Sequence, residues 1–326
     1  MIEAKKQKIT EDEVILDNSL RPKSFNEFIG QSDISKIKIF VEAAKIRQEV
    51  LDHFLFYGPP GLGKTTLAFV LATEMGSNLK LASGASLSKV ADLTSIITNL
   101  SEGDILFIDE IHRLNRQVEE ILYTAMEDYA IDIVVGKGPS ARTVRIELPK
   151  FTLIGATTLY GMVSSPLRDR FGVIHKMNFY NPEELSKIAQ RSAKILNVNI
   201  SQKALQSLAI RSRGTPRIIN RLLKRIRDIS QVEGVKLIEE SYVEYACKML
   251  GIDDNGLDKE DKMILKVIYT DFAGGPVGLS TLSASLLEDK GTIEEAIEPY
   301  LIKCGLIKRT NKGRVITEKG IKYLNI

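Results

Sequence analysis

The chain has 326 residues, of which 44% are hydrophobic and 27% charged, and a net charge of +3, values that are ordinary for a globular protein. Its length predicts two or three domains with sizeable cores. No run of eighteen apolar residues is present, and the first eight residues lack the apolar segment of a secretion signal, so we expect neither a membrane span nor export. Two lone cysteines and three scattered histidines exclude a disulfide scaffold and a zinc cluster, and favour a cytoplasmic protein.

The segment 20–31, LRPKSFNEFIGQ, precedes the first predicted strand. It fits an ordinary surface loop that leads into a helix. It also fits a lid over the base of a bound nucleotide, and the residues alone do not decide between the two.

The most informative motif is the phosphate loop, Gly58–Thr65, which fits the pattern G-x-x-x-x-G-K-[ST]. An apolar strand is predicted before it at 54–57, and an amphipathic helix after it at 66–75. Glycines let backbone N–H groups approach phosphate oxygens, and the helix N-terminus adds partial positive charge. Lys64 can then bind the β- and γ-phosphates of ATP, and the Thr65 hydroxyl can bind Mg²⁺.

A second apolar strand is predicted at 105–108, and it ends in Asp109-Glu110. Continuous apolar strands indicate a parallel sheet covered on both faces, in which ligands bind at the carboxyl ends of the strands. Asp109 is therefore expected to hold Mg²⁺, largely through water. Glu110 is expected to polarise the water that attacks the γ-phosphate, which would make the chain an ATP hydrolase.

Two arms, 131–135 and 143–148, surround a glycine- and proline-containing loop at 136–141 and predict a β-hairpin. The hairpin interrupts an otherwise α/β pattern. It is either a decorative insertion or a docking element for a partner protein.

A third strand is predicted at 151–154, and it is followed by Thr157 and Thr158. A hydroxyl at this strand end could sense the γ-phosphate, or the two residues could simply cap the strand. Arg168 and Arg170 then flank Asp169. One arginine could form a surface ion pair with Asp169, and the other could be an arginine finger, which stabilises charge in the transition state.

From residue 181 to 251 the pattern is helical throughout, and a proline-initiated helix places Arg217 in its first turn. A cation at a helix N-terminus opposes the helix dipole, which hints at an anionic ligand such as phosphate. The fold class that follows is an α/β ATPase domain with a parallel sheet at 1–180, and a small all-α domain at 181–251.

The last domain, 254–326, has three helical patterns at 258–270, 280–288 and 292–304, followed by two short strands, which is the pattern of a winged helix. Residues 303–322 carry seven Lys or Arg and one Glu. Such a basic hairpin fits contact with the phosphate backbone of duplex DNA, although a solvated lysine-rich edge has the same composition.

Together these motifs resemble the RuvB family of AAA+ ATPases, which drive branch migration of Holliday junctions. The resemblance covers nearly the whole chain. It rests on 20–23 with 29–31, 58–65, 108–114, 155–158, 165–172, 214–217 and 305–317. One departure is Leu159-Tyr160-Gly161, where the family usually has Arg-Ala-Gly.

The resemblance implies roles for particular residues. The adenine and ribose side would be lined by Leu20, Arg21 and Tyr180. The phosphates and Mg²⁺ would be held by Gly61, Gly63, Lys64, Thr65, Thr66 and Asp109. Catalysis would use Glu110, Thr158 as first sensor, Arg217 as second sensor, and Arg170 as the finger that reaches a neighbouring subunit. DNA would be contacted by Arg309 and Arg314.

The resemblance also implies partners. The chain would form a homo-hexamer, dock RuvA through the hairpin 131–148, and join RuvC in a resolving complex. Two alternatives stay open at this point: a clamp-loader-like ATPase, and a non-enzymatic winged-helix DNA regulator with a nucleotide switch. The basic wing disfavours the first, and Glu110 and Arg170 disfavour the second.

Overall fold

The computed structural model describes residues 19–135 and 142–324, so the first eight residues and the loop 136–141 of the expected hairpin lie outside the described residues. The chain divides into two compact units. The first comprises the chain up to Gly58 together with Gly63–Met177, and the second comprises Pro59–Leu62 and everything from Asn178 onward.

The first unit is built on a five-stranded sheet in the order β2-β3-β6-β1-β7, with every neighbouring pair parallel. The strands are β1 (Phe54–Tyr57), β2 (Leu79–Ser83), β3 (Ile105–Asp109), β6 (Thr152–Thr157) and β7 (Val173–Lys176). The three strands predicted from apolar runs are therefore present, and the parallel arrangement is confirmed. β2 and β7 escaped prediction because they are edge strands whose side chains are largely half-exposed or exposed, so they lack such a run.

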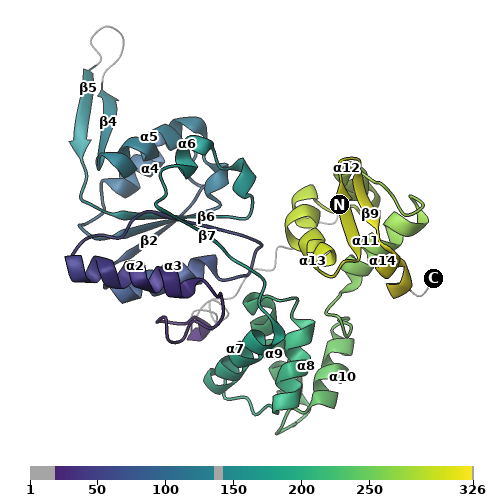
Figure 1. Cartoon of the computed structure of the whole chain (residues 1–326). Coiled ribbons are helices and arrows are strands. Elements are labelled where there is room, and N and C mark those ends of the chain that lie inside the picture. The colour runs from purple at the N-terminus through teal and green to yellow at the C-terminus, as the bar shows by residue number, and fades with distance from the viewer. Residues whose placement is uncertain (1–18, 136–141, 325–326) are drawn as a thin grey trace. The chain divides into compact units, whose positions relative to one another are not determined.

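Helices cover both faces of this sheet. α2 (Ile34–Arg47) and α3 (Lys64–Met75) lie on one face, and α4 (Val90–Ile97), α5 (Arg116–Glu127) and α6 (Ser165–Arg168) lie on the other (Figure 1). The apolar stripe of α5 packs into the core against strand residues such as Leu106 and Ile108, all nearly or fully buried. Burial on both faces holds the carboxyl ends of the strands in fixed positions.

The predicted hairpin consists of β4 (Ala130–Val135) and β5 (Arg142–Glu147), paired antiparallel. It projects beyond α4 and α5 (Figure 1). β5 is exposed along most of its length, so the hairpin contributes little to the core of the unit.

The second unit begins with four helices, α7 (Pro182–Ile195), α8 (Gln202–Arg211), α9 (Pro216–Val232) and α10 (Glu240–Met249). α7 starts as predicted: Asn181 accepts the Glu184 N–H, Glu184 accepts the Asn181 N–H in return, and Pro182 occupies the first turn. Among the described residues, no helix is long and apolar enough to cross a membrane.

A winged-helix domain follows in the same unit. It comprises α11 (Lys259–Thr270), α12 (Leu279–Leu286), a π-helical segment (Thr292–Ile297), α13 (Glu298–Lys303), β8 (Ile307–Thr310), β9 (Gly313–Ile316) and α14 (Glu318–Tyr323). The helix expected at 292–304 is present, with its first part π-helical and continued directly by α13. Pro299, in the first turn of α13, has no N–H to donate, so one hydrogen bond of the regular α-helical ladder is missing there.

Arg213 joins the helical part of the second unit to its winged helix. Its Nε donates to the Gly256 carbonyl at 2.8 Å, and its Nη2 binds Asp258 at 2.5 Å and also Asp261. The guanidinium also lies over the Tyr300 ring, 5.5 Å from its centroid. A largely buried arginine shared by two carboxylates makes this junction a specific one.

Candidate nucleotide site and DNA-binding wing

The first unit contains the two ends of the phosphate loop, and each end has a glycine with a backbone conformation that other residues rarely adopt. Gly58 has φ +142, and a Cβ there would lie 2.5 Å from the Met177 carbonyl oxygen. Gly63, with φ +99, precedes the first turn of α3, which holds Lys64, Thr65 and Thr66. The Lys64 ammonium is buried in the loop and donates to the Gly58 carbonyl at 2.7 Å. The loop therefore forms a cradle of the kind that binds phosphate.

The acidic pair lies at the carboxyl end of β3, as predicted. Asp109 ends the strand, and its Oδ1 accepts the Glu110 N–H at 2.9 Å. Glu110 has left-handed backbone angles, φ +49 and ψ +43, which cost a non-glycine residue about 1–2 kcal/mol. Its carboxylate lies 3.4 Å from the Arg113 Nε. Strain of this kind is held by the surrounding structure and is often found at catalytic sites.

The structure separates the roles of Thr157 and Thr158. Thr157 ends β6, is fully buried, and pairs in register with Tyr57 beside the phosphate loop. Its hydroxyl lies 2.8 Å from His112 Nδ1 and accepts the Leu159 N–H at 2.9 Å. Thr158 is the next residue beyond the strand. Because β6 lies between β3 and β1, Thr158 follows the strand that separates Asp109-Glu110 from the phosphate loop.

The segment that carries Leu20 and Arg21 packs on α3. Leu20 is buried, and the Arg21 guanidinium lies 5.0 Å from the centre of the Phe69 ring. The Phe25 N–H donates to Glu74 at 3.0 Å. This part of the chain is thus an anchored segment next to the helix that starts in the phosphate loop.

In the second unit, Gly61, Tyr180 and Arg217 come together. The Arg217 N–H donates to the Gly61 carbonyl at 3.4 Å, and the Tyr180 hydroxyl donates to the Leu62 carbonyl at 3.2 Å. A Cβ on Gly61, whose φ is +79, would lie 3.1 Å from the Arg217 Cβ. Burial and the like charges of Arg213 and Arg217 lower the pKa of Arg221. This concentration of positive charge favours an anion, which fits the proposed second sensor.

Mg²⁺ fits the donor set of the first unit. Among the described residues, no group of three His, Cys, Asp or Glu side chains could hold a metal ion by itself. Mg²⁺ typically binds one or two protein oxygens and completes its shell with water and phosphate oxygens. The Thr65 hydroxyl and the Asp109 carboxylate are oxygen donors of the required kind.

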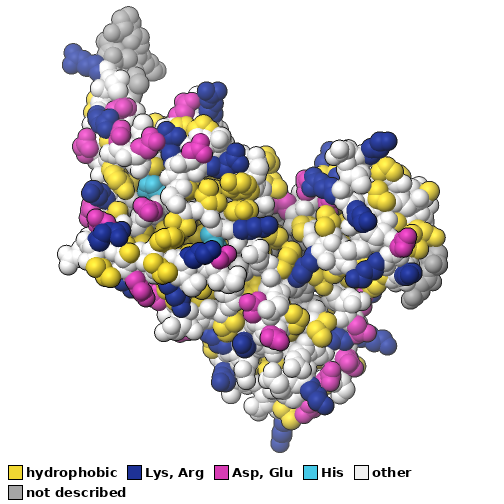
Figure 2. Space-filling model, in the orientation of Figure 1, with side chains coloured by type: hydrophobic (Ala, Val, Ile, Leu, Met, Phe, Trp, Pro, Cys, Tyr) yellow, Lys and Arg dark blue, Asp and Glu magenta, His cyan; other side chains and the backbone are white. Residues whose placement is uncertain are grey.

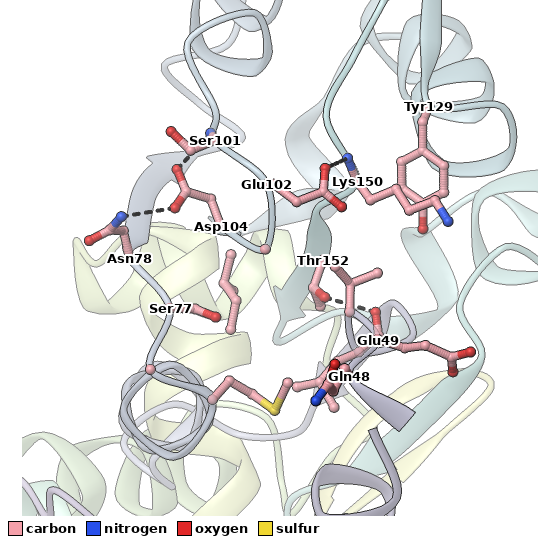
Figure 3. Close-up of a pocket in the computed structure, with 16 residues that line it drawn as sticks. Gln48, Glu49, Ser77, Asn78, Ser101, Glu102, Asp104, Tyr129, Lys150 and Thr152 are labelled. Carbon is pink, nitrogen blue, oxygen red and sulfur yellow. Dashed lines mark hydrogen bonds between the residues drawn. The ribbon is translucent and has the colours of Figure 1, made fainter. Parts of the chain in front are cut away.

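A cavity of about 570 Å³ lies at the edge of the sheet opposite the phosphate loop, where the strands begin (Figure 3). Its polar groups already bind one another: Asp104 accepts from Asn78 at 3.0 Å and from the Ser101 N–H at 2.9 Å, and Glu102 accepts the Lys150 N–H at 3.0 Å. Parallel α/β sheets bind their ligands at the other edge. We therefore assign the nucleotide to the edge with the phosphate loop.

Comparison with known proteins agrees with this geometry over all three parts of the chain. Residues 20–177 match the model for the Holliday junction DNA helicase RuvB P-loop domain, residues 180–253 the RuvB AAA lid domain, and residues 254–325 the RuvB C-terminal winged helix domain. The Holliday junction branch migration complex subunit RuvB of Fusobacterium nucleatum is 56% identical over 96% of this chain and 94% of its own length.

The chain belongs to the RuvB family. The solved structure of the Thermotoga maritima RuvB Holliday junction branch migration motor is similar, with a TM-score of 0.87 and 48% identity, covering 94% of this chain and 98% of that one. The R170A form of the same Thermotoga protein matches with the same values. The fold is thus an AAA+ P-loop domain, a lid domain and a winged helix, and the chain is an ATPase of the RuvB family.

Arg170, the expected finger of this RuvB-family chain, is held by its own subunit. Nη1 donates to the Pro166 carbonyl at 2.8 Å, and Nη2 binds Glu127 at 3.0 Å. The guanidinium lies 4.4 Å from the centre of the Tyr123 ring, and Nε is buried with no hydrogen-bond partner among the residues that the structure describes. Arg170 therefore pairs with Glu127, and the surface pair with Asp169 that the sequence allowed is not what holds it.

The two wing arginines differ in their surroundings. Arg309 is exposed and binds Glu294 at 2.5 Å, whereas the Arg314 side chain is only 8% exposed and binds Glu298, itself buried, at 2.7 Å. A buried guanidinium that is already paired is not available to a DNA phosphate. Arg314 therefore supports the wing from inside, contrary to the expectation that it contacts DNA.

The exposed cations of the wing are Lys308, Arg309 and Lys312. Figure 2 shows Lys and Arg side chains spread over the winged-helix part, with few acidic side chains among them in that view. The surface is thus suited to a phosphate backbone, even though acidic residues of the preceding helical segment neutralise part of its charge.

The hairpin carries an apolar stripe from the core outward. Ile131 is fully buried and pairs with Ile146. The next pair on that face is Ile133 with Val144, and Val144 is 46% exposed. An apolar stripe on a projecting hairpin fits a docking element better than a decorative insertion does.

Several residues around the site carried no usable signal in the sequence. Gly84 has no motif, yet a Cβ there would lie 2.4 Å from the Glu110 carbonyl oxygen. Glu127 occupies an ordinary-looking polar position, yet it binds Arg170. His112 and Arg113, which binds Glu110, lie in the family motif 108–114, and that was their only signal.

Proposed function

We propose that this chain is the ATP-driven motor that moves Holliday junctions along DNA in recombination and repair, acting as a hexameric ring. The observation that supports this best is the meeting, at one edge of the sheet, of the phosphate loop, Asp109-Glu110 and the end of β6 that carries Thr158. A water-orienting carboxylate next to a phosphate loop distinguishes a hydrolase from a nucleotide-binding switch.

We assign each residue of the nucleotide site a part in ATP hydrolysis. The loop glycines Gly61 and Gly63 and the side chains of Lys64, Thr65 and Thr66 bind the phosphates, and Leu20, Arg21 and Tyr180 line the side of the base and ribose. Glu110 orients and polarises the attacking water, while Thr158 and Arg217 act as the first and second sensors of the nucleotide. Mg²⁺, held by Thr65 and Asp109, neutralises charge on the phosphates.

The surroundings of Arg170 support the proposal of a ring. Arg170 is fixed by Tyr123, Glu127 and Pro166 of α5 and α6, rather than by the phosphate loop of its own chain. A finger that serves a neighbouring subunit's ATP makes hydrolysis depend on assembly. Each subunit then supplies a phosphate loop to one site and Arg170 to the next.

The hairpin formed by β4 and β5 docks RuvA, the junction-binding partner, through the stripe that ends at Val144. RuvC joins the assembly when the junction is resolved. The domains are the ATPase domain at 1–180, the lid at 181–251 and the winged helix at 254–326. The motor works in the cytoplasm, where its DNA substrate lies.

The test of this function is a branch-migration assay on a four-way DNA junction with purified RuvA. We expect the chain to convert the junction into duplex products only when ATP and Mg²⁺ are present. Lys64→Ala should abolish this activity, because the loop then lacks its phosphate-binding cation. Conversion of junctions without nucleotide hydrolysis, or no conversion with all components present, would argue for a nucleotide-switched DNA regulator or a clamp loader instead.

The exposed cations of the wing allow a separate prediction about DNA binding. Lys308→Ala/Lys312→Ala removes two exposed cations, so duplex binding should weaken and the slope of log affinity against log salt should fall by about two. The loss should be the same for unrelated DNA sequences. Titration of labelled duplexes at several salt concentrations measures both quantities.

Lys266→Ala is the matched control for the wing, because it removes an exposed cation from α11 of the same domain. It should leave the salt slope nearly unchanged. An equal effect of Lys266→Ala would show that general charge rather than the wing attracts DNA. A loss confined to one DNA sequence would show base-specific reading and contradict the motor.

A further inference from the structure

The hydroxyl of Thr157 joins two segments that carry parts of the ATPase site. It lies 2.8 Å from His112 Nδ1 on one side and accepts the Leu159 N–H at 2.9 Å on the other. Thr157 is fully buried and His112 nearly so. One side chain therefore connects the end of β6, the loop after Thr158, and the turn that follows Glu110.

The Thr157 hydroxyl can form both of these hydrogen bonds at the same time. A threonine hydroxyl has one proton to donate and two lone pairs. The Leu159 N–H occupies one lone pair. The bond to His112 then forms in either tautomer, because Oγ1 can donate to Nδ1 or accept its proton.

His112 lies in the short 3-10 turn Ile111–Arg113, immediately after Glu110. Glu110 has left-handed backbone angles, its carbonyl accepts the Arg113 N–H at 2.9 Å, and the backbone at Gly84 packs closely against it. A residue in such a conformation keeps it only when neighbouring contacts hold it there. The hydrogen bond between Thr157 and His112 connects this turn to the end of β6.

We propose that His112 and Thr157 are positioning residues for ATP hydrolysis: their hydrogen bond fixes Glu110 relative to Thr158. The inference rests on the proposed function, in which Glu110 orients the attacking water and Thr158 contacts the γ-phosphate. Those two groups come from different strands, so their relative position depends on a connection between β3 and β6. Thr157 does not itself sense the γ-phosphate, since its hydroxyl is buried against His112.

The test is Thr157→Val, which keeps the shape of the side chain and removes only the hydroxyl. We expect kcat for ATP hydrolysis in the presence of DNA to fall by about tenfold to a hundredfold, because small displacements of catalytic groups have effects of this size. KM and the affinity for ADP should stay within about twofold, because the phosphate loop is untouched. Thr157→Ser should restore kcat, since it restores the hydroxyl.

Thr152→Val is the matched control. Thr152 is also buried on β6, and its hydroxyl donates to the Leu51 carbonyl at 2.8 Å, but it lies at the opposite end of the strand. Thr152→Val also loses one buried hydroxyl hydrogen bond, so its thermal stability should fall by about as much as that of Thr157→Val. Its kcat should equal that of the wild-type protein, so a purely structural effect would be recognised.

His112 provides an independent arm should Thr157→Val fail to fold. His112→Phe keeps a ring but removes the nitrogen, and it should lower kcat as Thr157→Val does, whereas His112→Asn keeps a polar atom near the Nδ1 position and should lower it less. The double variant Thr157→Val/His112→Phe should lose no more than either single variant.

The proposal is overturned if Thr157→Val or His112→Phe keeps the wild-type kcat, or if Thr152→Val loses as much as Thr157→Val does. Additive losses in the double variant would also overturn it, because the two residues would then act separately. Glu110→Gln is measured in parallel. If that variant turns over ATP normally, the assignment of Glu110 fails, which is a different result from failure of the His112–Thr157 connection.

Discussion

Glu110→Gln should abolish ATP turnover while leaving ATP binding intact. The amide fills the same space as the carboxylate but cannot accept a proton from the attacking water, and loss of a general base typically lowers a rate by about 10²–10⁴. The phosphate loop, which supplies most of the binding, is unchanged. Turnover is measured by phosphate release, and binding by a fluorescent ATP analogue.

Glu120→Gln is the control for this substitution. Glu120 is an exposed carboxylate on α5 that pairs with Arg116 at 3.1 Å, and its replacement should leave turnover unchanged. We expect Glu110→Gln rings to remain loaded with ATP on DNA. Normal phosphate release by Glu110→Gln would refute its role in activating water, and loss of ATP binding would show that the side chain serves the loop instead.

Arg170→Ala should lower ATP turnover by about 10³ or more, the typical contribution of an arginine finger. The defect should appear at the neighbouring subunit's site. Mixing Arg170→Ala with Lys64→Ala subunits should therefore restore part of the activity. At some subunit interfaces, the Arg170→Ala subunit then supplies an intact phosphate loop and the Lys64→Ala subunit supplies an intact arginine finger.

The neighbouring Arg168 offers the matched control, because it also lies over an aromatic ring, 5.1 Å from the centre of Tyr160. Arg168→Ala should have a much smaller effect and should not be complemented by Lys64→Ala. The absence of recovery at every mixing ratio of Arg170→Ala and Lys64→Ala would argue that each site is complete within one chain.

The strands that position the nucleotide site could be predicted because burial on both faces gives continuous apolar runs, as in β1, β3 and β6. The edge strands β2 and β7 could not, since partial exposure places lysine, serine and histidine among their residues. The helix that contains Pro299 shows a second limit. Periodicity predicted the helix, but it could not predict that the part before Pro299 is π-helical rather than α-helical.

Motif spacing predicted which residues gather at the carboxyl edge of the sheet, since parallel strands bring their ends together. It could not predict the direction of individual side chains. Thr157 and Thr158 are the same residue type, yet the hydroxyl of Thr157 binds His112, 45 positions earlier in the chain. Arg309 and Arg314 lie opposite each other on the wing, yet only Arg314 is buried against Glu298.

Completion of each ATP site by a second subunit is the central feature of the proposed motor. The most direct measurement is the rate of ATP hydrolysis per subunit, followed against protein concentration in the presence of duplex DNA. We predict that this rate rises steeply over the concentrations at which rings assemble, and then levels off. A rate per subunit that is already maximal for dilute monomers, and that DNA does not change, would contradict the account.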